Sequence, residues 1–550
     1  MKKWMLLLFL LPLTGLAQSG MYKYFIFFSD KNNSPYSLTA PSSFLTQLAI
    51  DRRSRQQIPF DSLDLPVNPS YMNGVGSTGA RLFARSKWFN GIIVECDSTV
   101  LAQILNLPYV SGGKKINRHG STTHSKFEIS TRANLRIPAT DQTASIDYGA
   151  GYNQIHLMNG EYLHDQGFTG NGMLIAMLDA GFYQADQVTY FSNLLQRNGI
   201  VATWDFVADE STVFEDDSHG MECMSTIAAD VPGQMVGTAP DASFILLRSE
   251  DVFSENIIEE YNWAAAAEYA DSAGADLISS SLGYTEFQDI TSSHTYSDMN
   301  GHTAPSSIAA NVAFSRGMVV VVSAGNSGQD VWHYISAPGD GDSVLTAGAV
   351  DGNGIFAPFS SYGPAADGDV KPTVVTQGLA AIVVDPFSNL SFASGTSFSC
   401  PILAGSTACL WQQYPGKTNT EIKQAITQSA SLYTTPNDSM GYGIPNFQAA
   451  SFILSTNDPK VNTSDLFNVF PNLFNETVYV NVFTLKSSSV EMSLYNTTGE
   501  KIIQWKNTIQ PGIINTLPIA LPSELASGYY FLQLITDHGE LVKPLVKFGK

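Results

Sequence analysis

The chain has 550 residues, of which 44% are hydrophobic and 14% are charged, and its formal net charge is −21. This length exceeds a single hydrophobic core, so several domains are expected, and the low charged fraction excludes a largely disordered chain. The negative charge disfavours nucleic acid and anionic membranes as partners and suits an exported soluble protein.

The first 17 residues have the pattern of a secretory signal peptide. Lys2 and Lys3 precede the apolar run Met5–Leu13, and a small-residue sequence ending at Ala17 follows it. We expect cleavage after Ala17. A membrane anchor is the alternative, but the apolar run is too short to span a bilayer.

Residues 18–130 are predicted to form a small α+β domain with the element order βαββαβ. Strands are expected at 22–28, 80–87, 91–96 and from 109 onward, and helices at 42–55 and 99–105.

Residues 145–455 alternate between apolar strand runs and helical patterns. Continuous apolar strands separated by helices indicate a parallel sheet that is buried on both faces, so we predict a doubly wound α/β domain. The predicted strands are 173–178, 243–247, 275–278, 318–322, 344–350 and 380–384, and the predicted helices are 222–229, 256–273, 306–315, 398–413 and 420–429.

The last part of the chain has a different character. Residues 455–465 are polar and are predicted to form a linker. Residues 466–550 contain short alternating runs, at 478–482, 490–495 and 529–534, separated by turn signals. This pattern predicts a small β-sandwich.

Ser397 lies where the small-residue turn Gly395-Thr396-Ser397 opens into a helical pattern with Pro401 in its first turn. A hydroxyl on a tight turn at the positive end of a helix suits a nucleophile. The alternative is an ordinary helix cap, a common role for serine and threonine.

Asp179 and His219 also lie at the ends of predicted elements. Asp179 follows the apolar run 174–178, and ligands of open α/β sheets bind at the carboxyl ends of strands. His219 opens a helical run at Gly220. The alternatives are a turn-forming aspartate and a surface histidine near a cap.

Asn326 follows the apolar run 318–322 within Ser323-Ala324-Gly325-Asn326-Ser327-Gly328. An amide donor at the carboxyl end of a strand can stabilise a developing oxyanion. An Asn-Ser-Gly turn is the alternative reading.

These residues occur in the order Asp179, His219, Asn326, Ser397, and Asp…His…Ser is the chain order of subtilisin. Their surroundings, over residues 148–450, resemble the subtilisin-like serine peptidases (subtilases, peptidase family S8). The motifs that carry the resemblance are Leu178-Asp179-Ala180-Gly181, His219-Gly220-Met221-Glu222-Cys223, the run from Gly395 to Gly405, Ser281-Leu282-Gly283, Ser336-Ala337-Pro338, the run from Phe359 to Pro364, and Lys371-Pro372.

The resemblance implies a role for each matching residue. Ser397 would be the nucleophile, His219 the general base and acid, and Asp179 the residue that orients the histidine. The Asn326 side chain and the Ser397 backbone N–H would form the oxyanion hole. The segments Ser281-Leu282-Gly283 and Ser323-Ala324-Gly325 would flank the substrate side chain at P1 and pair with the substrate as an added strand.

The chain departs from the family pattern at a few positions. Met221 and Met224 stand where the family has small or hydroxyl side chains, and Val375-Thr376-Gln377-Gly378 replaces the usual Ala-Pro-Gly. These changes can reshape the pocket but leave the triad positions intact.

The four cysteines, Cys96, Cys223, Cys400 and Cys409, lack the CxxC spacing of a zinc site and are too few for a disulfide scaffold. Cys223 resembles the free cysteine beside the histidine in one branch of the family, which implies inhibition by mercury. An ordinary buried cysteine is the alternative.

Both flanking domains carry resemblances of their own. Residues 86–91 and 101–110 resemble the inhibitory prodomain of subtilases, and the processing junction is expected between Ile116 and Asp147. Residues 469–474, 494–499, 525–530 and 542–550 resemble the C-terminal sorting domain of type IX secretion in Bacteroidetes. A sugar-binding or adhesive β-sandwich is the alternative for this last domain.

The sequence therefore predicts a secreted serine endopeptidase, made as a zymogen and reaching the medium or cell surface through the periplasm. Its expected partners are protein substrates, its own prodomain and the type IX secretion machinery, with no nucleic acid. Two alternatives stay open, namely a non-catalytic adhesion or binding protein on a protease fold and a processing protease of narrow specificity.

No cofactor is predicted with certainty, and calcium is possible. Calcium is common in the family, and Asp and Gly cluster at 340–342, 351–354 and 367–369. Simple turns are the alternative for these clusters.

Overall fold

The computed structural model describes residues 20–117 and 145–456, together with 467–547 apart from short gaps at 471–472, 475–476, 484–488, 511–513, 523–524 and 537–538. The predicted signal peptide and the greater part of the predicted processing junction lie outside these residues. Among the described helices, none is long and apolar enough to cross a membrane.

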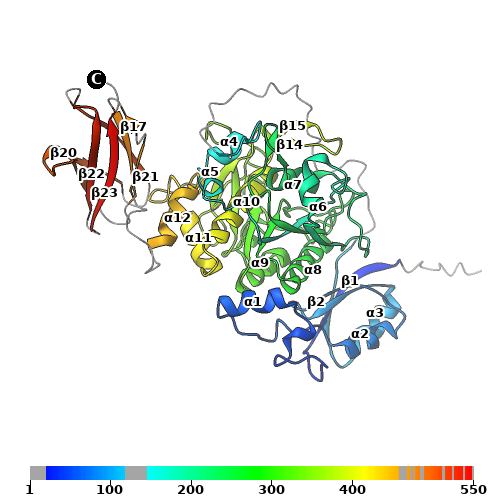
Figure 1. Ribbon diagram of the computed structural model, residues 1–550. Helices are drawn as coiled ribbons and strands as arrows, with labels where there is room; N and C mark the ends of the chain where they lie inside the picture. Colours follow the sequence, from blue (N-terminus) through cyan, green and yellow to red (C-terminus); the bar gives the residue numbers. More distant parts are fainter. Residues whose placement is uncertain are drawn as a thin grey trace, which may run out of the picture.

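The central domain is built on a seven-stranded sheet with the order β13-β12-β11-β10-β5-β9-β6, in which all neighbouring strands run parallel (Figure 1). This confirms the predicted doubly wound α/β class. In chain order the strands are β5 (Leu174–Asp179), β6 (Ile200–Asp205), β9 (Ser243–Arg248), β10 (Leu277–Ser280), β11 (Val319–Ser323), β12 (Leu345–Val350) and β13 (Val374–Gln377).

Successive strand residues enter two different cores because side chains alternate between the faces of a sheet. Ile175 and Met177 pack with α7 (His219–Ala228) and α10 (Thr396–Gln413). Ala176 and Leu178 pack with α8 (Ile258–Ala273) and α9 (Pro305–Ser315) on the other face. Burial on both faces explains why the strands read as continuous apolar runs.

Smaller elements complete this domain. They are α4 (Tyr152–His156), α5 (Glu161–Asp165), α6 (Ser192–Gln196), α11 (Asn419–Gln428), α12 (Phe447–Thr456) and the two-stranded pairs β7 (Asp230–Val231) with β8 (Met235–Val236) and β14 (Ala381–Val384) with β15 (Leu390–Ala393). The expected strand at 380–384 is β14, which lies outside the central sheet. Residues 455 and 456 of the expected polar linker belong to α12 instead, and the rest of that expected linker, 457–465, lies outside the described residues.

The N-terminal domain has an antiparallel sheet of order β2-β3-β1-β4, formed by β1 (Tyr22–Phe28), β2 (Arg81–Ser86), β3 (Gly91–Cys96) and β4 (Val110–Lys115). Its helices are α1 (Gln47–Arg55), α2 (Pro69–Gly76) and α3 (Ser98–Leu105). The sequence did not lead us to predict α2. The Asn68 side chain caps this helix by accepting a hydrogen bond from Ser70 N, and Pro69 is its first residue.

The sheet of the N-terminal domain packs on helix α8 of the central domain. The rings of Phe25 and Tyr261 stack with centroids 4.5 Å apart. The Glu268 carboxylate accepts hydrogen bonds from Lys87 N (2.6 Å), Trp88 N (3.0 Å) and Ser86 Oγ (2.5 Å). Figure 1 shows this domain below α8 and α9, with α1 reaching under both helices.

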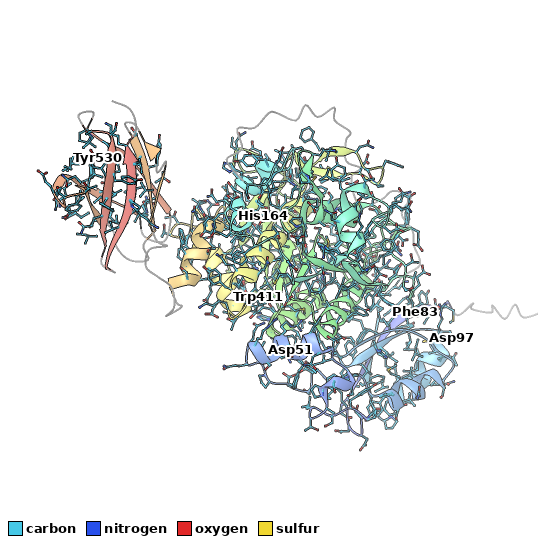
Figure 2. The ribbon with its side chains drawn as sticks, viewed as in Figure 1. Asp51, Phe83, Asp97, His164, Trp411 and Tyr530 are labelled. Carbon is cyan, nitrogen blue, oxygen red and sulfur yellow. The ribbon has the colours of Figure 1, made fainter. Side chains whose placement is uncertain are left out.

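The C-terminal domain has two packed sheets, as predicted for a β-sandwich. One sheet has the order β16-β18-β21 and the other β17-β23-β22-β19-β20. The strands are β16 (Phe467–Phe470), β17 (Leu473–Phe474), β18 (Thr477–Phe483), β19 (Ser489–Asn496), β20 (Lys501–Thr508), β21 (Ile514–Ala520), β22 (Gly528–Thr536) and β23 (Gly539–Lys547). Tyr530, labelled in Figure 2, contributes to their shared core.

Candidate active site

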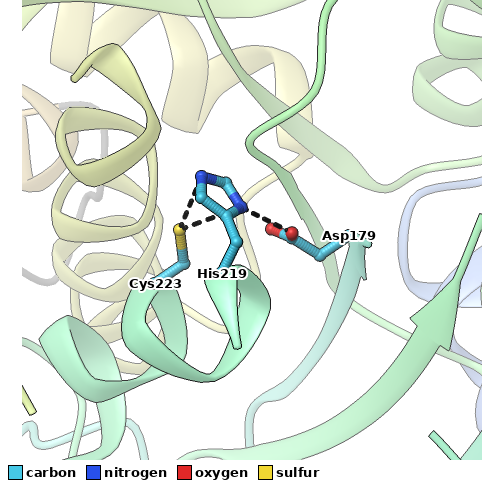
Figure 3. A group of neighbouring side chains, drawn as sticks. All are labelled: Asp179, His219 and Cys223. Atoms are coloured by element: carbon cyan, nitrogen blue, oxygen red, sulfur yellow. Dashed lines mark hydrogen bonds and ion pairs between the residues drawn. The ribbon is translucent and has the colours of Figure 1, made fainter. Parts of the chain in front are cut away.

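Asp179 and His219 form a buried, hydrogen-bonded pair. Asp179 is the last residue of β5, and His219 is the first residue of α7. Asp179 Oδ1 lies 2.6 Å from His219 Nδ1 and also accepts a hydrogen bond from Ala180 N (Figure 3). This contact places the proton of a neutral ring on Nδ1 and leaves Nε2 as the basic nitrogen.

The pair depends on a close approach at Gly220. A Cβ atom on Gly220 would lie 2.5 Å from Gly181 O and 2.8 Å from Asp179 Cβ. Only glycine therefore lets α7 begin this close to the end of β5. The His-Gly pair at the start of the helix is a consequence of that contact.

The electrostatics of the pair shift the histidine. Burial alone would lower the pKa of His219, but the charge and hydrogen bond of Asp179 raise this pKa well above the ordinary value of 6.5. The protonated imidazole is thus stabilised by its surroundings, as a general base requires once it has taken a proton.

Ser397 lies in the first turn of α10, buried to 7% exposure. Its backbone carbonyl accepts hydrogen bonds from Ser281 Oγ (2.7 Å) and from Cys223 Sγ (3.3 Å). Cys223 Sγ also lies 3.9 Å from His219 Nε2, and Figure 3 shows the two side chains facing each other. The three predicted triad residues therefore come from separate elements and converge at the carboxyl edge of the sheet.

Asn326 follows β11 and is exposed. Its Oδ1 accepts hydrogen bonds from Thr396 N and Thr396 Oγ1, both at 2.9 Å. A Cβ atom on Gly395 would lie 3.4 Å from Asn326 Nδ2. With the oxygen held in this way, the amide NH₂ lies beside the turn that carries Ser397, where it can donate to a substrate.

The two predicted substrate segments, Ser281–Gly283 and Ser323–Gly325, lie together because β10 and β11 are neighbouring parallel strands. Ser323 Oγ donates to Leu282 O at 3.4 Å. Ser336 joins the segments, since its N–H donates to Ala324 O at 3.2 Å.

The Ser336 side chain fills the space between two glycines. A Cβ atom on Gly283 would overlap Ser336 Oγ, and one on Gly325 would lie 3.1 Å from it. Within the described residues this buried hydroxyl has no hydrogen-bond partner. Sequence reasoning noted Ser336 only as part of a motif, because its position between the segments arises from a loop contact that no local pattern signals.

The departures from the family pattern are accommodated in the core. Met221 and Met224 are fully buried among apolar side chains. Residues 375–377 of the segment that replaces Ala-Pro-Gly belong to strand β13, and Thr376 Oγ1 donates to Ser399 O at 2.9 Å. All four cysteines are described, are buried and form no disulfide.

The predicted calcium clusters differ from one another. Asp351 accepts hydrogen bonds from Asn353 N and Ile355 N, which is the pattern of a simple turn. Asp342, Asp367 and Asp369 come from two of the clusters and bring carboxylate oxygens within 4.8 Å of one another on the surface. This donor set fits a hard cation such as Ca²⁺, and calcium stays a proposal without a part in the chemistry.

Comparisons with known proteins match three parts of the chain. The subtilase family model matches residues 170–443, the peptidase S8 propeptide domain of Bacteroidota matches 23–130, and the secretion system C-terminal sorting domain matches 468–547. These matches confirm the predicted resemblances, and the sorting domain indicates a location outside the cell or at its surface.

Individual relatives are more distant. Serine protease AprX of Bacillus subtilis (strain 168) is 30% identical over 290 residues, which cover 48% of this chain and 62% of the relative. Thermophilic serine proteinase of Bacillus sp. (strain AK1) is 28% identical over 295 residues, covering 53% and 65%. The chain thus spans less than two thirds of either relative.

Among solved structures, the crystal structure of MycP1 from the ESX-1 type VII secretion system matches with a TM-score of 0.46 and 20% identity. The match covers 60% of this chain and 91% of that one.

If His219 is the general base, activity depends on its neutral form. Because Asp179 raises the pKa of His219 above 6.5, the protonated, inactive form persists to higher pH. We expect kcat/KM for a peptide substrate to rise with pH along an acid limb whose midpoint lies above 6.5. Asp179→Asn should move that midpoint downward and lower kcat, and an unmoved midpoint in this variant would contradict the assignment.

If Cys223 lies beside the histidine as described, a mercuric ion bound to its Sγ would crowd the His219 ring 3.9 Å away. We expect slow, time-dependent loss of activity in mercuric chloride, because the thiol is buried. Cys223→Ala should resist this loss, whereas Cys409→Ala, which alters a buried thiol bonded to Thr238 O, should stay sensitive. Equal sensitivity of both variants would exclude Cys223 as the target.

Proposed function

The chain belongs to the subtilase family through residues 170–443, and we propose on that premise that it is a secreted serine endopeptidase made as a zymogen. The observation that carries the proposal is the buried Asp179–His219 pair beside the first turn of α10, where Ser397 lies.

In the proposed mechanism, Ser397 Oγ attacks the carbonyl carbon of the scissile peptide bond while His219 Nε2 takes the hydroxyl proton. Asp179 holds the ring and stabilises the imidazolium that forms. The tetrahedral intermediate collapses as His219 gives its proton to the leaving amine, which produces an acyl-enzyme. A water molecule then attacks the acyl-enzyme with the same base and releases the new carboxyl end.

Two donors are proposed to stabilise the negative oxygen of each tetrahedral intermediate, namely Asn326 Nδ2 and the Ser397 N–H. The geometry that supports this proposal is the fixed Asn326 Oδ1, which Thr396 holds through two hydrogen bonds. Because the donors are in place before the reaction, they require little reorganisation as charge develops. The positive end of the α10 dipole adds to the same effect.

The N-terminal domain is proposed to be an inhibitory propeptide. Its family match and its packing on α8 through Phe25 and the loop at Lys87 support this role. The C-terminal sorting domain supports export through the type IX machinery. Proteins or peptides are the proposed substrates.

The non-catalytic alternative predicts a chain with the same fold but no reactive serine. The mature protein should digest casein and be labelled by a fluorophosphonate, because the proposed mechanism gives Ser397 an activating base. Ser397→Ala should abolish labelling and lower activity at least about 10³-fold. Ser399→Ala, which alters a buried hydroxyl two residues away, should keep the labelling. Casein digestion that survives Ser397→Ala unchanged would contradict the mechanism.

Ser336 bears on which substrate side chain the enzyme accepts at P1. Ser336 occupies the space between Gly283 and Gly325 and its backbone N–H is bonded to Ala324 O, so we propose that it makes the P1 pocket shallow. Small P1 residues should therefore be preferred over aromatic ones.

Ser336→Gly should deepen the pocket and raise kcat/KM for P1 Phe relative to P1 Ala by about tenfold or more, since pocket volume is worth roughly 1–3 kcal/mol per methylene. Ser336→Ala, which keeps Cβ, should shift the ratio less. A matched series of peptide anilides measures the ratio, and Ser406→Ala, another buried hydroxyl without a partner among described residues, is the control. An unchanged ratio in Ser336→Gly would refute the assignment while leaving the triad untouched.

A further inference from the structure

An arginine of the N-terminal domain is fully buried against the central domain. It lies at the end of the sheet where the strands begin, opposite the candidate active site. Arg52, on α1 of the N-terminal domain, is 0% exposed. Its guanidinium donates to Asp271 Oδ1 (2.5 Å), to Asp271 O (3.1 Å), to Arg316 O through Nε (3.3 Å) and to Ala275 O. Figures 1 and 2 show α1, marked by Asp51, beneath the lower ends of α8 and α9.

Every acceptor of this arginine belongs to the central domain and lies where an element ends or begins. Asp271 is in the last turn of α8, Arg316 is the C-cap of α9, and Ala275 precedes β10. Carbonyls at the C-terminal ends of helices lack partners within the helix and carry a partial negative charge, so a cation is favoured there. The acceptors together form a socket with the shape and charge that a guanidinium requires.

The distance from the triad follows from the strands. Ala275 lies before β10 and Ser281 lies after it, so about 20 Å of extended chain separates the socket from the substrate segment. Binding in the socket can therefore be independent of the active site.

A second layer of charge surrounds Asp271. Arg53 Nη2 lies 2.6 Å from Asp271 Oδ1, and Lys87 Nζ lies 2.8 Å from Asp271 Oδ2. Arg53 is neutralised in turn by Asp64 at 3.0 Å. Burial alone would raise the pKa of Asp271, but Lys87, Arg53 and Arg52 hold it well below its ordinary range, so the carboxylate is charged in the complex.

The backbone of α1 fits the same place closely. Gly274, which ends α8 in a left-handed conformation (φ 95°), would place a Cβ 2.8 Å from Ala49 N. Beyond Arg52, Gln56 Nε2 donates to Gly317 O at 2.7 Å, and Gln56 Oε1 accepts from Asn419 N at 2.9 Å. The contact therefore extends from α8 across α9 to the start of α11.

We propose that the peptidase domain carries an arginine-binding site formed by Asp271, Ala275 O and Arg316 O, and that this site is a distal anchor for the propeptide through Arg52. The ligand class is a guanidinium presented by a helix. The inference rests on the proposed function only in treating the N-terminal domain as a segment that is cut from the peptidase domain. After that cut, the anchor holds the propeptide in place without the active site.

The test uses the full chain with Ser397→Ala, so that no proteolysis of its own enters the result. A recognition sequence for a sequence-specific endoprotease is placed between residues 118 and 144, the purified protein is cut there, and the rate of propeptide release is measured by size-exclusion chromatography. Failure of the proposed peptidase activity would leave this measurement unaffected.

Arg52→Ala and Asp271→Asn should each speed release at least about 100-fold, because each leaves a buried charge or its acceptors uncompensated. Arg52→Lys keeps the charge but loses the planar fork, so an intermediate rate is expected. Arg55→Ala is the matched control, since that side chain is 52% exposed and makes a surface ion pair with Asp276 at 3.3 Å, and its rate should stay within about twofold.

Parental release rates in Arg52→Ala and Asp271→Asn would overturn the proposal. Near-ultraviolet circular dichroism before cutting shows whether each variant has folded. If Asp271→Asn does not fold, the cut parent decides the question with added N-acetyl-arginine amide or N-acetyl-lysine amide. The arginine amide should release more propeptide at equilibrium, and equal release by both would reject a guanidinium site.

Discussion

The hydrogen bond between Asp179 and His219 brings a carboxylate of 1% exposure against an imidazole of 7% exposure. Removing an ionised carboxylate from water is costly unless partners replace the lost hydration. Here Ala180 N and the histidine ring supply them, and the ring does so because α7 begins directly beside the end of β5. This one contact explains three features of the site. They are the close approach of Gly220 to Gly181 O, the start of α7 at its histidine, and the burial of the methionines behind it.

The parallel sheet gives the peptidase domain two rims of opposite chemical character. At the carboxyl rim lie the candidate active-site side chains, and helices α7 and α10 present their positive ends there. At the other rim, α8 and α9 end in carbonyls and the strands begin. The negative ends of the helix dipoles attract cations to that second rim, just as the positive ends favour a nucleophile and an oxyanion at the first. The N-terminal domain uses this asymmetry, because its sheet covers α8 while α1 supplies arginine to the rim.

Sequence patterns predicted what depends on local periodicity or on a single residue type. The apolar runs gave five of the seven central strands, whereas β6 and β13 were missed because Thr203 and Thr376 interrupt their apolar character. The convergence of Asp179, His219 and Ser397 was predictable because each residue terminates or starts an element. The position of Ser336 and the contact between Arg52 and Asp271, 219 residues apart in sequence, depend on tertiary packing that no local pattern reports.

A buried ion pair is weak evidence for stability, since the Coulombic gain is largely offset by desolvation. The network around Asp271 therefore anchors the propeptide mainly through the penalty for a missing or displaced partner, which exceeds the net gain of the matched ion pair. A partner that lacks one cation leaves the buried Asp271 carboxylate undercompensated, and a helix shifted by one residue carries its guanidinium about 100° around the axis, away from the carbonyls of Ala275 and Arg316. Apolar packing, as between Phe25 and Tyr261, does not distinguish one helix or one register from another in this way. The socket thus fixes which helix docks and in what register, while the sheet interface on α8 contributes the buried area.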